Sequence, residues 1–151
     1  MRLTIGAETL QAIGEQAQTG YPEEVCGALL GKAQSDGTIA VTDAVALKNS
    51  RADERRRRYL VGPNDVLALE KRAATAGLSV VGYYHSHPDS PAVPSELDRE
   101  QGWPWYTYLI VSVAEARMSD ARAWRLRDDR ERFLEMAVER RDGIKIEAER
   151  G

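Results

Sequence analysis

An apolar run that leads directly into both histidines of the chain constrains the fold most. Residues 78–84 are rich in β-forming residues, and they are followed by His85-Ser86-His87-Pro88. A short continuous apolar segment of this kind is typical of a buried central strand. Because alternate residues of a strand point to the same face, we expect the imidazoles of His85 and His87 to reach one point.

Helical and strand patterns surround this central strand. Helices are predicted over residues 7–19, 63–76 and from Pro94-Ser95 to about Gln101. Further strands are predicted over residues 3–5, 25–31, 39–47, 59–61, 106–113, 121–127 and 133–139, with a turn at Asp142-Gly143 before residues 144–146. We find no internal repeat or linker. The sequence therefore predicts one domain, residues 1–151, of the α/β class, with helices packed on a mixed sheet.

Charge argues against a general nucleic-acid binder. The net charge is -3, whereas neutralising phosphates requires a basic face. The run Arg55–Arg58 is either a solvated segment or a local patch for an anionic partner, and composition does not decide between them. No segment has the apolar length of a signal peptide or a membrane span.

Cysteine content limits the chemistry further. Cys26 is the only cysteine, so neither an internal disulfide nor a cysteine-rich zinc site is expected, and a reducing cytoplasm is the predicted location. A zinc nucleoside deaminase is excluded because it needs a Cys-x-x-Cys segment.

His85, His87 and Asp98 are candidate metal ligands. Asp98 lies eleven residues after His87, on the predicted short helix. Two imidazoles and one carboxylate, with a position left for water, form the ligand set of a catalytic zinc site. Both parts also have ordinary interpretations: His-x-His occurs at strand edges, and Asp98 three residues after Ser95 fits a helix-capping box.

Hydrolysis of an amide needs a base as well as a metal ion. Glu23 and Glu24 stand just before the apolar segment 25–31, where a carboxylate could meet the site. Adjacent glutamates point in different directions, so at most one is the base. Both could instead be surface acids.

These two blocks together resemble the JAMM metalloproteases, also called MPN-plus domains. That family carries an early glutamate and, much later, His-x-His, seven residues, Ser, two residues and Asp. The matching positions here are Glu24, His85, His87, Ser95 and Asp98. Glu24-Val25-Cys26-Gly27 is similar to the family's glutamate-x-Cys-Gly segment, which selects Glu24 over Glu23. The resemblance covers about residues 1–115.

The resemblance implies a JAB/MPN fold with the layered, cytidine deaminase-like architecture, and it assigns roles. His85, His87 and Asp98 would bind one catalytic zinc ion, Glu24 would act as general base, and Ser95 would donate a hydrogen bond to the oxyanion. Ser86 is expected to point away from the metal. Cys26 is expected to be a small buried residue.

Compact members without insertions resemble bacterial enzymes that process ubiquitin-like sulfur-carrier proteins. The implied function is a zinc-dependent peptidase or isopeptidase that hydrolyses an amide bond at the C-terminal diglycine of such a partner. Its extended tail would be held by main-chain hydrogen bonds. Two alternatives stay open: a non-catalytic MPN interaction scaffold, and a cysteine hydrolase that uses Cys26 and a histidine.

Overall fold

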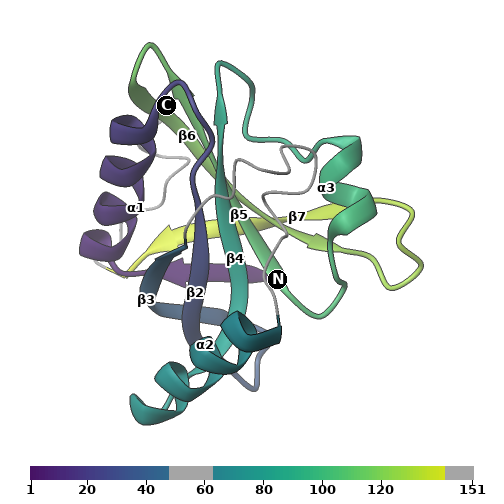
Figure 1. The fold of residues 1–151 in the computed structure, drawn as a ribbon. Coiled ribbons are helices and arrows are strands. Elements are labelled where there is room, and N and C mark those ends of the chain that lie inside the picture. Colours follow the sequence, from purple (N-terminus) through teal and green to yellow (C-terminus); the bar gives the residue numbers. More distant parts are fainter. Residues whose placement is uncertain (48–62, 142–151) are drawn as a thin grey trace.

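The computed structural model describes residues 1–47 and 63–141, which form three helices and seven strands (Figure 1). The helices are α1 (Ala7–Gly20), α2 (Pro63–Thr75) and α3 (Glu96–Gln101). The strands are β1 (Arg2–Ile5), β2 (Cys26–Ala33), β3 (Ile39–Leu47), β4 (Ser79–Pro88), β5 (Thr107–Ala114), β6 (Arg117–Leu126) and β7 (Phe133–Arg140).

The strands form one mixed sheet that closes on itself in the order β1-β3-β2-β4-β5-β6-β7. β1 pairs in parallel with both β3 and β7, and β4 pairs in parallel with β5, whereas the other neighbours are antiparallel. The predicted α/β class and mixed sheet are therefore confirmed in this coarse form. Closure through β1 is a feature that the predicted layered architecture did not include.

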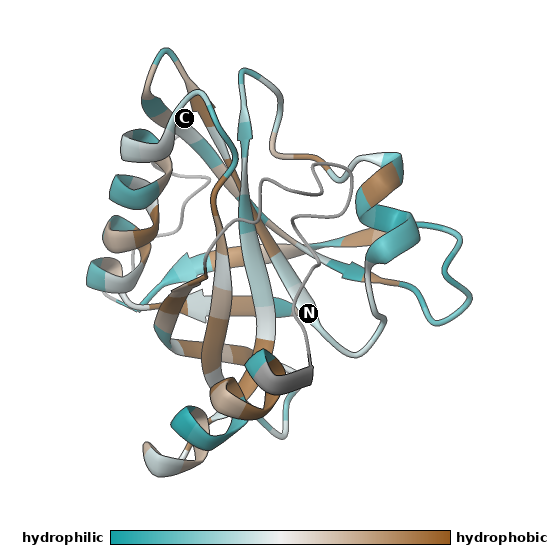
Figure 2. Cartoon of the chain, in the orientation of Figure 1, coloured by the Kyte–Doolittle hydropathy of each residue, from teal (hydrophilic) through white to brown (hydrophobic). Residues whose placement is uncertain are grey.

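The larger part of the core lies between α1 and the sheet. Leu10, Ile13 and Ala17 follow one another at helical spacing, and all three are buried, as the sequence predicts. In Figure 2 the central strands carry most of the hydrophobic colour, and the solvent side of α1 is largely hydrophilic. Burial of this apolar stripe fixes α1 against the sheet.

A second, smaller cluster forms where α2 packs on β2 and β4. Leu69 and Ala73 of α2 are buried against Ala28, Leu30 and Val80. Val66, which the helical spacing predicts to face inward together with Leu69 and Ala73, is only half-buried. Gly77 follows the helix with a φ of 72°, a left-handed conformation that suits a glycine after a helix end.

Two local predictions differ from the structure. β6 begins at Arg117 instead of residue 121, because Glu115 and Ala116 make a two-residue hairpin turn with φ of 50° and 64°. Such turns favour Asn and Gly, so this sequence did not signal one. The alternating sequence of residues 133–139 predicts one shared face for Leu134, Met136 and Val138, but Leu134 is 38% exposed, since it borders an open cavity lined by Met1 and residues 125–129.

The predicted strand 59–61, the turn before residues 144–146 and the run Arg55–Arg58 lie outside the described residues. Among the residues that are described, no helix is both long and apolar enough to cross a membrane.

Candidate metal centre

The two histidines lie near the end of β4, in the middle of the sheet. β4 is flanked by β2 on one side and by β5 on the other. In these ladders His85 pairs with Cys26 and Ile110, and His87 pairs with Ser112. The two imidazoles are 2% and 7% exposed, so both rings are held in a packed environment.

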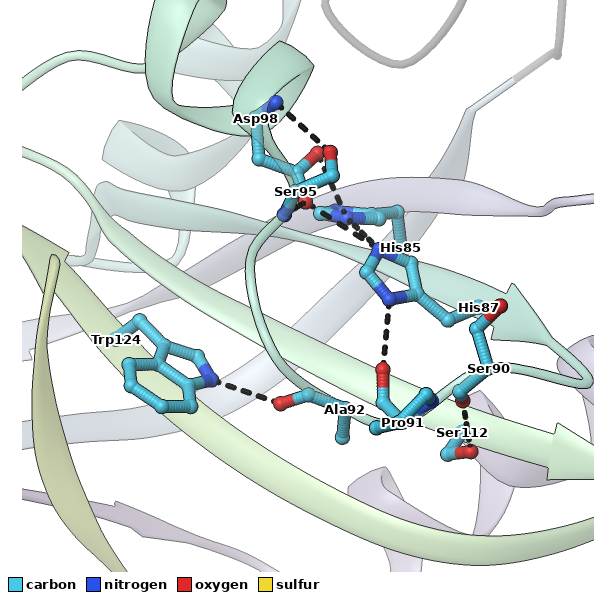
Figure 3. Close-up of polar contacts among 9 residues, drawn as sticks. All are labelled: His85, His87, Ser90, Pro91, Ala92, Ser95, Asp98, Ser112 and Trp124. Atoms are coloured by element: carbon cyan, nitrogen blue, oxygen red, sulfur yellow. Dashed lines mark hydrogen bonds and ion pairs between the residues drawn. The ribbon is translucent and has the colours of Figure 1, made fainter. Parts of the chain in front are cut away.

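Asp98 of α3 completes a buried group of three ligand atoms, as sequence spacing predicts (Figure 3). His85 Nε2 lies 3.2 Å from His87 Nε2 and 3.2 Å from Asp98 Oδ1. His87 Nε2 lies 3.3 Å from Asp98 Oδ2. In a tetrahedral zinc site with bonds near 2.0–2.1 Å, neighbouring ligand atoms are about 3.3 Å apart. The donor types and their separations therefore fit one zinc ion.

A hydrogen bond at Nδ1 of His87 leaves Nε2 as the nitrogen that is free to bind a metal. His87 Nδ1 lies 2.9 Å from the carbonyl oxygen of Pro91, which can only accept a hydrogen bond. Nδ1 therefore carries the proton, and in the neutral ring Nε2 presents a lone pair to the group. An acceptor of this kind behind a histidine ligand is the usual device that sets ring orientation at metal sites.

Electrostatics agree with a site built for a cation. Burial raises the pKa of the Asp98 carboxyl, but hydrogen bonds from His85 and His87 outweigh burial, and the pKa lies well below its usual range. Burial lowers the pKa of His87, yet its contacts with Asp98 and Pro91 raise it overall. Without a metal ion, a proton on His87 is thus favoured at the same place.

Asp98 also closes a capping box at the start of α3. The Ser95 hydroxyl accepts a hydrogen bond from the Asp98 amide at 3.1 Å, and Asp98 Oδ2 accepts one from the Ser95 amide at 2.8 Å. The capping interpretation of this stretch is therefore correct, and it does not compete with metal binding, because the carboxylate faces both partners. Ser95 itself is exposed beside the group.

Glu24 is half-buried in the connection between α1 and β2, whereas Glu23 is exposed. The Glu24 charge contributes to the raised pKa of His87, so its carboxylate acts on this site electrostatically. The backbone next to it is tied to β4: the Val25 amide donates to Ser86 Oγ at 2.9 Å, and the Ser86 amide donates to the Val25 carbonyl at 3.0 Å. The Ser86 side chain is fully buried and engaged with Val25, as predicted.

Cys26 is buried, as predicted, and lies at the start of β2. The packing of Tyr84 explains why Gly27 follows Cys26. A Cβ atom on Gly27 would lie 2.2 Å from the ring of Tyr84, so only a glycine leaves room for that ring. Tyr84 in turn donates a hydrogen bond to Gln16 of α1, which joins the helix to the strand of the histidines.

Sequence reasoning missed the polar groups that form hydrogen bonds in the loop between β4 and α3. The Pro91 carbonyl, the Ser112 hydroxyl and the Trp124 indole are separated from the motif or carry no side-chain signal. The only hint was the proline content of residues 88–94, which is typical of a loop with restricted backbone conformation.

Known proteins are similar to this chain over most of its length. A desampylase from Haloferax volcanii is 40% identical over 143 residues, which cover 91% of this chain and 97% of the relative. The tail tip assembly protein K of Escherichia phage N15 is 31% identical over 112 residues, 72% of this chain and 40% of that protein. This chain thus spans less than half of the phage protein.

Solved structures and a family match agree with these relatives. A solution structure from Salinibacter ruber is 39% identical with a TM-score of 0.72, covering 94% of this chain and 92% of that one. A JAB1/MPN domain protein from Archaeoglobus fulgidus shares the fold at 19% identity, with a TM-score of 0.56 over 91% of this chain and 98% of its own. Residues 6–127 match the family described as prokaryotic homologs of the JAB domain. With its buried His-His-Asp group, this chain belongs to the prokaryotic JAB-domain family.

Proposed function

We propose that this protein is a zinc-dependent peptidase or isopeptidase that hydrolyses an amide bond at the C-terminal diglycine of a ubiquitin-like or sulfur-carrier protein. The buried group of His85, His87 and Asp98, with ligand atoms 3.2–3.3 Å apart, carries the proposal. Family membership and the 40% identity to a desampylase support the isopeptidase class.

Each role in the proposed reaction is assigned to a residue of this chain. His85, His87 and Asp98 hold the zinc ion, which when bound polarises the scissile carbonyl and acidifies a water molecule. Glu24 accepts a proton from the attacking water and passes it to the leaving nitrogen. The Ser95 hydroxyl, exposed at the start of α3, donates a hydrogen bond to the oxyanion that forms as the carbonyl is attacked.

The identity of the partner follows from the resemblance and the name of the relative, so it is the part most in need of a direct test. Two glycines would allow an extended tail to enter a narrow channel that side chains would block. Main-chain hydrogen bonds would then provide most of the tail's affinity.

The test measures metal content together with cleavage of a carrier-protein fusion. We expect about one zinc per chain, cleavage after the diglycine, loss of cleavage with a chelator and recovery on zinc addition. A matched fusion that ends in Ala-Ala should resist cleavage. Equal cleavage of both fusions would refute the diglycine preference.

The same assay separates the alternatives. A non-catalytic scaffold would leave every fusion intact even when the metal is bound. A cysteine hydrolase would lose activity on thiol alkylation or in Cys26→Ala and would ignore the chelator. The proposed enzyme responds in the opposite way to both treatments.

A further inference from the structure

The loop of residues 89–95 connects the second histidine to the serine and aspartate of α3. Three successive carbonyl groups of this loop each accept a hydrogen bond from a different side chain (Figure 3). The Ser90 carbonyl accepts from Ser112 Oγ, the Pro91 carbonyl from His87 Nδ1, and the Ala92 carbonyl from Trp124 Nε1 at 3.0 Å. The loop is therefore bonded to β5, to β4 and to β6 at consecutive residues.

This loop has no helix or strand of its own to fix its shape. The Asp89 amide donates to the Val113 carbonyl at 2.7 Å, which attaches the first residue to β5. Ala92, in the middle of the loop, is 1% exposed. External donors and burial thus replace the internal hydrogen bonds that a regular element would supply.

We propose that Ser112 and Trp124 are positioning residues of the metal centre. From β5 and β6 they hold the loop in the shape that brings Asp98 to the two histidines. Neither is a metal ligand: each acts through the loop backbone. The inference rests on the proposed function only in taking His85, His87 and Asp98 as the ligand set.

The place of Ser112 in the sheet explains why it suits this role. It pairs with His87 in the β4–β5 ladder and is 6% exposed, so its hydroxyl is held in a rigid environment next to a ligand. Trp124 approaches the same loop from β6, on the far side of β5. A loop fixed at both points loses little further freedom when a metal ion binds, which strengthens binding.

The experiment measures zinc affinity by competition with a chelating dye, using the full chain. Ser112→Ala and Trp124→Phe each remove one donor, and we expect each to weaken zinc binding about tenfold, in the range found for groups that support metal ligands. Ser79→Ala and Trp105→Phe are matched controls. Ser79 is exposed at the start of β4 and Trp105 is 64% exposed, so both substitutions should leave affinity unchanged.

A second measurement does not depend on the metal. In the zinc-free protein, hydrogen exchange at the Asp89 and Asp98 amides should become faster in both donor variants, while the melting temperature changes little. A purely structural role would instead lower the melting temperature and leave affinity unchanged. The conservative Ser112→Thr keeps the hydroxyl and should recover part of the lost affinity.

The two proposals fail in different ways. A wild-type protein that binds zinc but cleaves no fusion would overturn the proposed function and leave this inference standing. Unchanged zinc affinity and unchanged exchange in both donor variants would overturn the inference, whatever the enzyme cleaves.

Discussion

The three candidate metal ligands and the segment that carries Glu24 are held in different ways. His85, His87 and Asp98 are buried, and their loop is bonded to three strands. Residues 21–25 have no regular secondary structure, and Glu24 is half-buried. Its neighbour Val25 is attached to Ser86 by two hydrogen bonds, one accepted by the Ser86 hydroxyl and one donated by the Ser86 amide. Because Glu24 lies on a different segment from His85, His87 and Asp98, substitutions should separate metal binding from turnover.

A surface contact adds to the attachment of the Glu24 segment. The Tyr21 hydroxyl donates to the Asp89 carboxylate, with distances of 2.9 and 2.8 Å to its two oxygens. This hydrogen bond raises the pKa of Tyr21. Asp89 directly follows β4, the strand of the two histidines, and has a φ of 55°. Its contact with Tyr21 therefore joins the end of this strand to a residue close to Glu24.

Asp98→Asn, a substitution within the group of His85, His87 and Asp98, should have the largest effect. Asparagine keeps the size of the side chain and an acceptor for the Ser95 amide but removes the negative charge that faces two imidazoles. We expect zinc affinity to fall by more than about 100-fold and cleavage to be lost with it. Metal analysis after dialysis checks the result, and full zinc content would remove Asp98 from the ligand set.

Glu24→Gln should separate metal binding from turnover most clearly. The glutamine cannot accept the proton, so we expect kcat to fall by about 10²–10⁴-fold while zinc content stays unchanged. Glu23→Gln is the matched control, because Glu23 is exposed and should keep both properties. Near-full activity of Glu24→Gln would assign the base to another residue.

Ser95 has a structural contact and a proposed catalytic one, which two substitutions distinguish. Ser95→Ala should lower stability by about 1 kcal/mol through loss of the N-cap, whereas Ser95→Gly should lower it by only a few tenths. If the hydroxyl stabilises the oxyanion, both variants should lose about 100-fold in kcat. If the loss of activity is instead proportional to the loss of stability, Ser95 acts only as the N-cap of α3.

Tyr21→Phe should have the smallest effect. The ring packs against the main core cluster, so phenylalanine keeps its packing and removes only the hydroxyl. The contact is exposed to solvent, so we expect kcat to fall by no more than a few-fold, with unchanged KM and zinc content. In the Tyr21→Phe background, Asp89→Asn should then change little more, because the contact is already gone. Independent effects of the two substitutions would argue against this contact.

Local patterns predicted most of the elements. The apolar spacing of α1, the run of β4 and the boundaries of β3 depend on neighbouring residues, and these predictions were confirmed. The turn at Glu115-Ala116 was missed because its backbone conformation arises from strand pairing and not from turn-forming residues.

The site was predictable to the extent that its residues lie in short motifs. The spacing of His85, His87 and Asp98 predicted that they would meet, and the structure confirms the group. The roles of Glu24 and Ser95 stay predictions. Ser112 and Trp124 had no sequence signal, because they reach the loop across strands that are neighbours only in the folded sheet.

The first strand has a consequence for how the molecule is assembled. β1 lies between β3 and β7, and its pairing with β7 joins residues 2–5 to residues 137–140. Contacts between residues so far apart in sequence slow folding. On the ribosome, β1 must wait for residues 137–140 to emerge before its second neighbour exists, so nascent chains expose an unpaired strand edge until then.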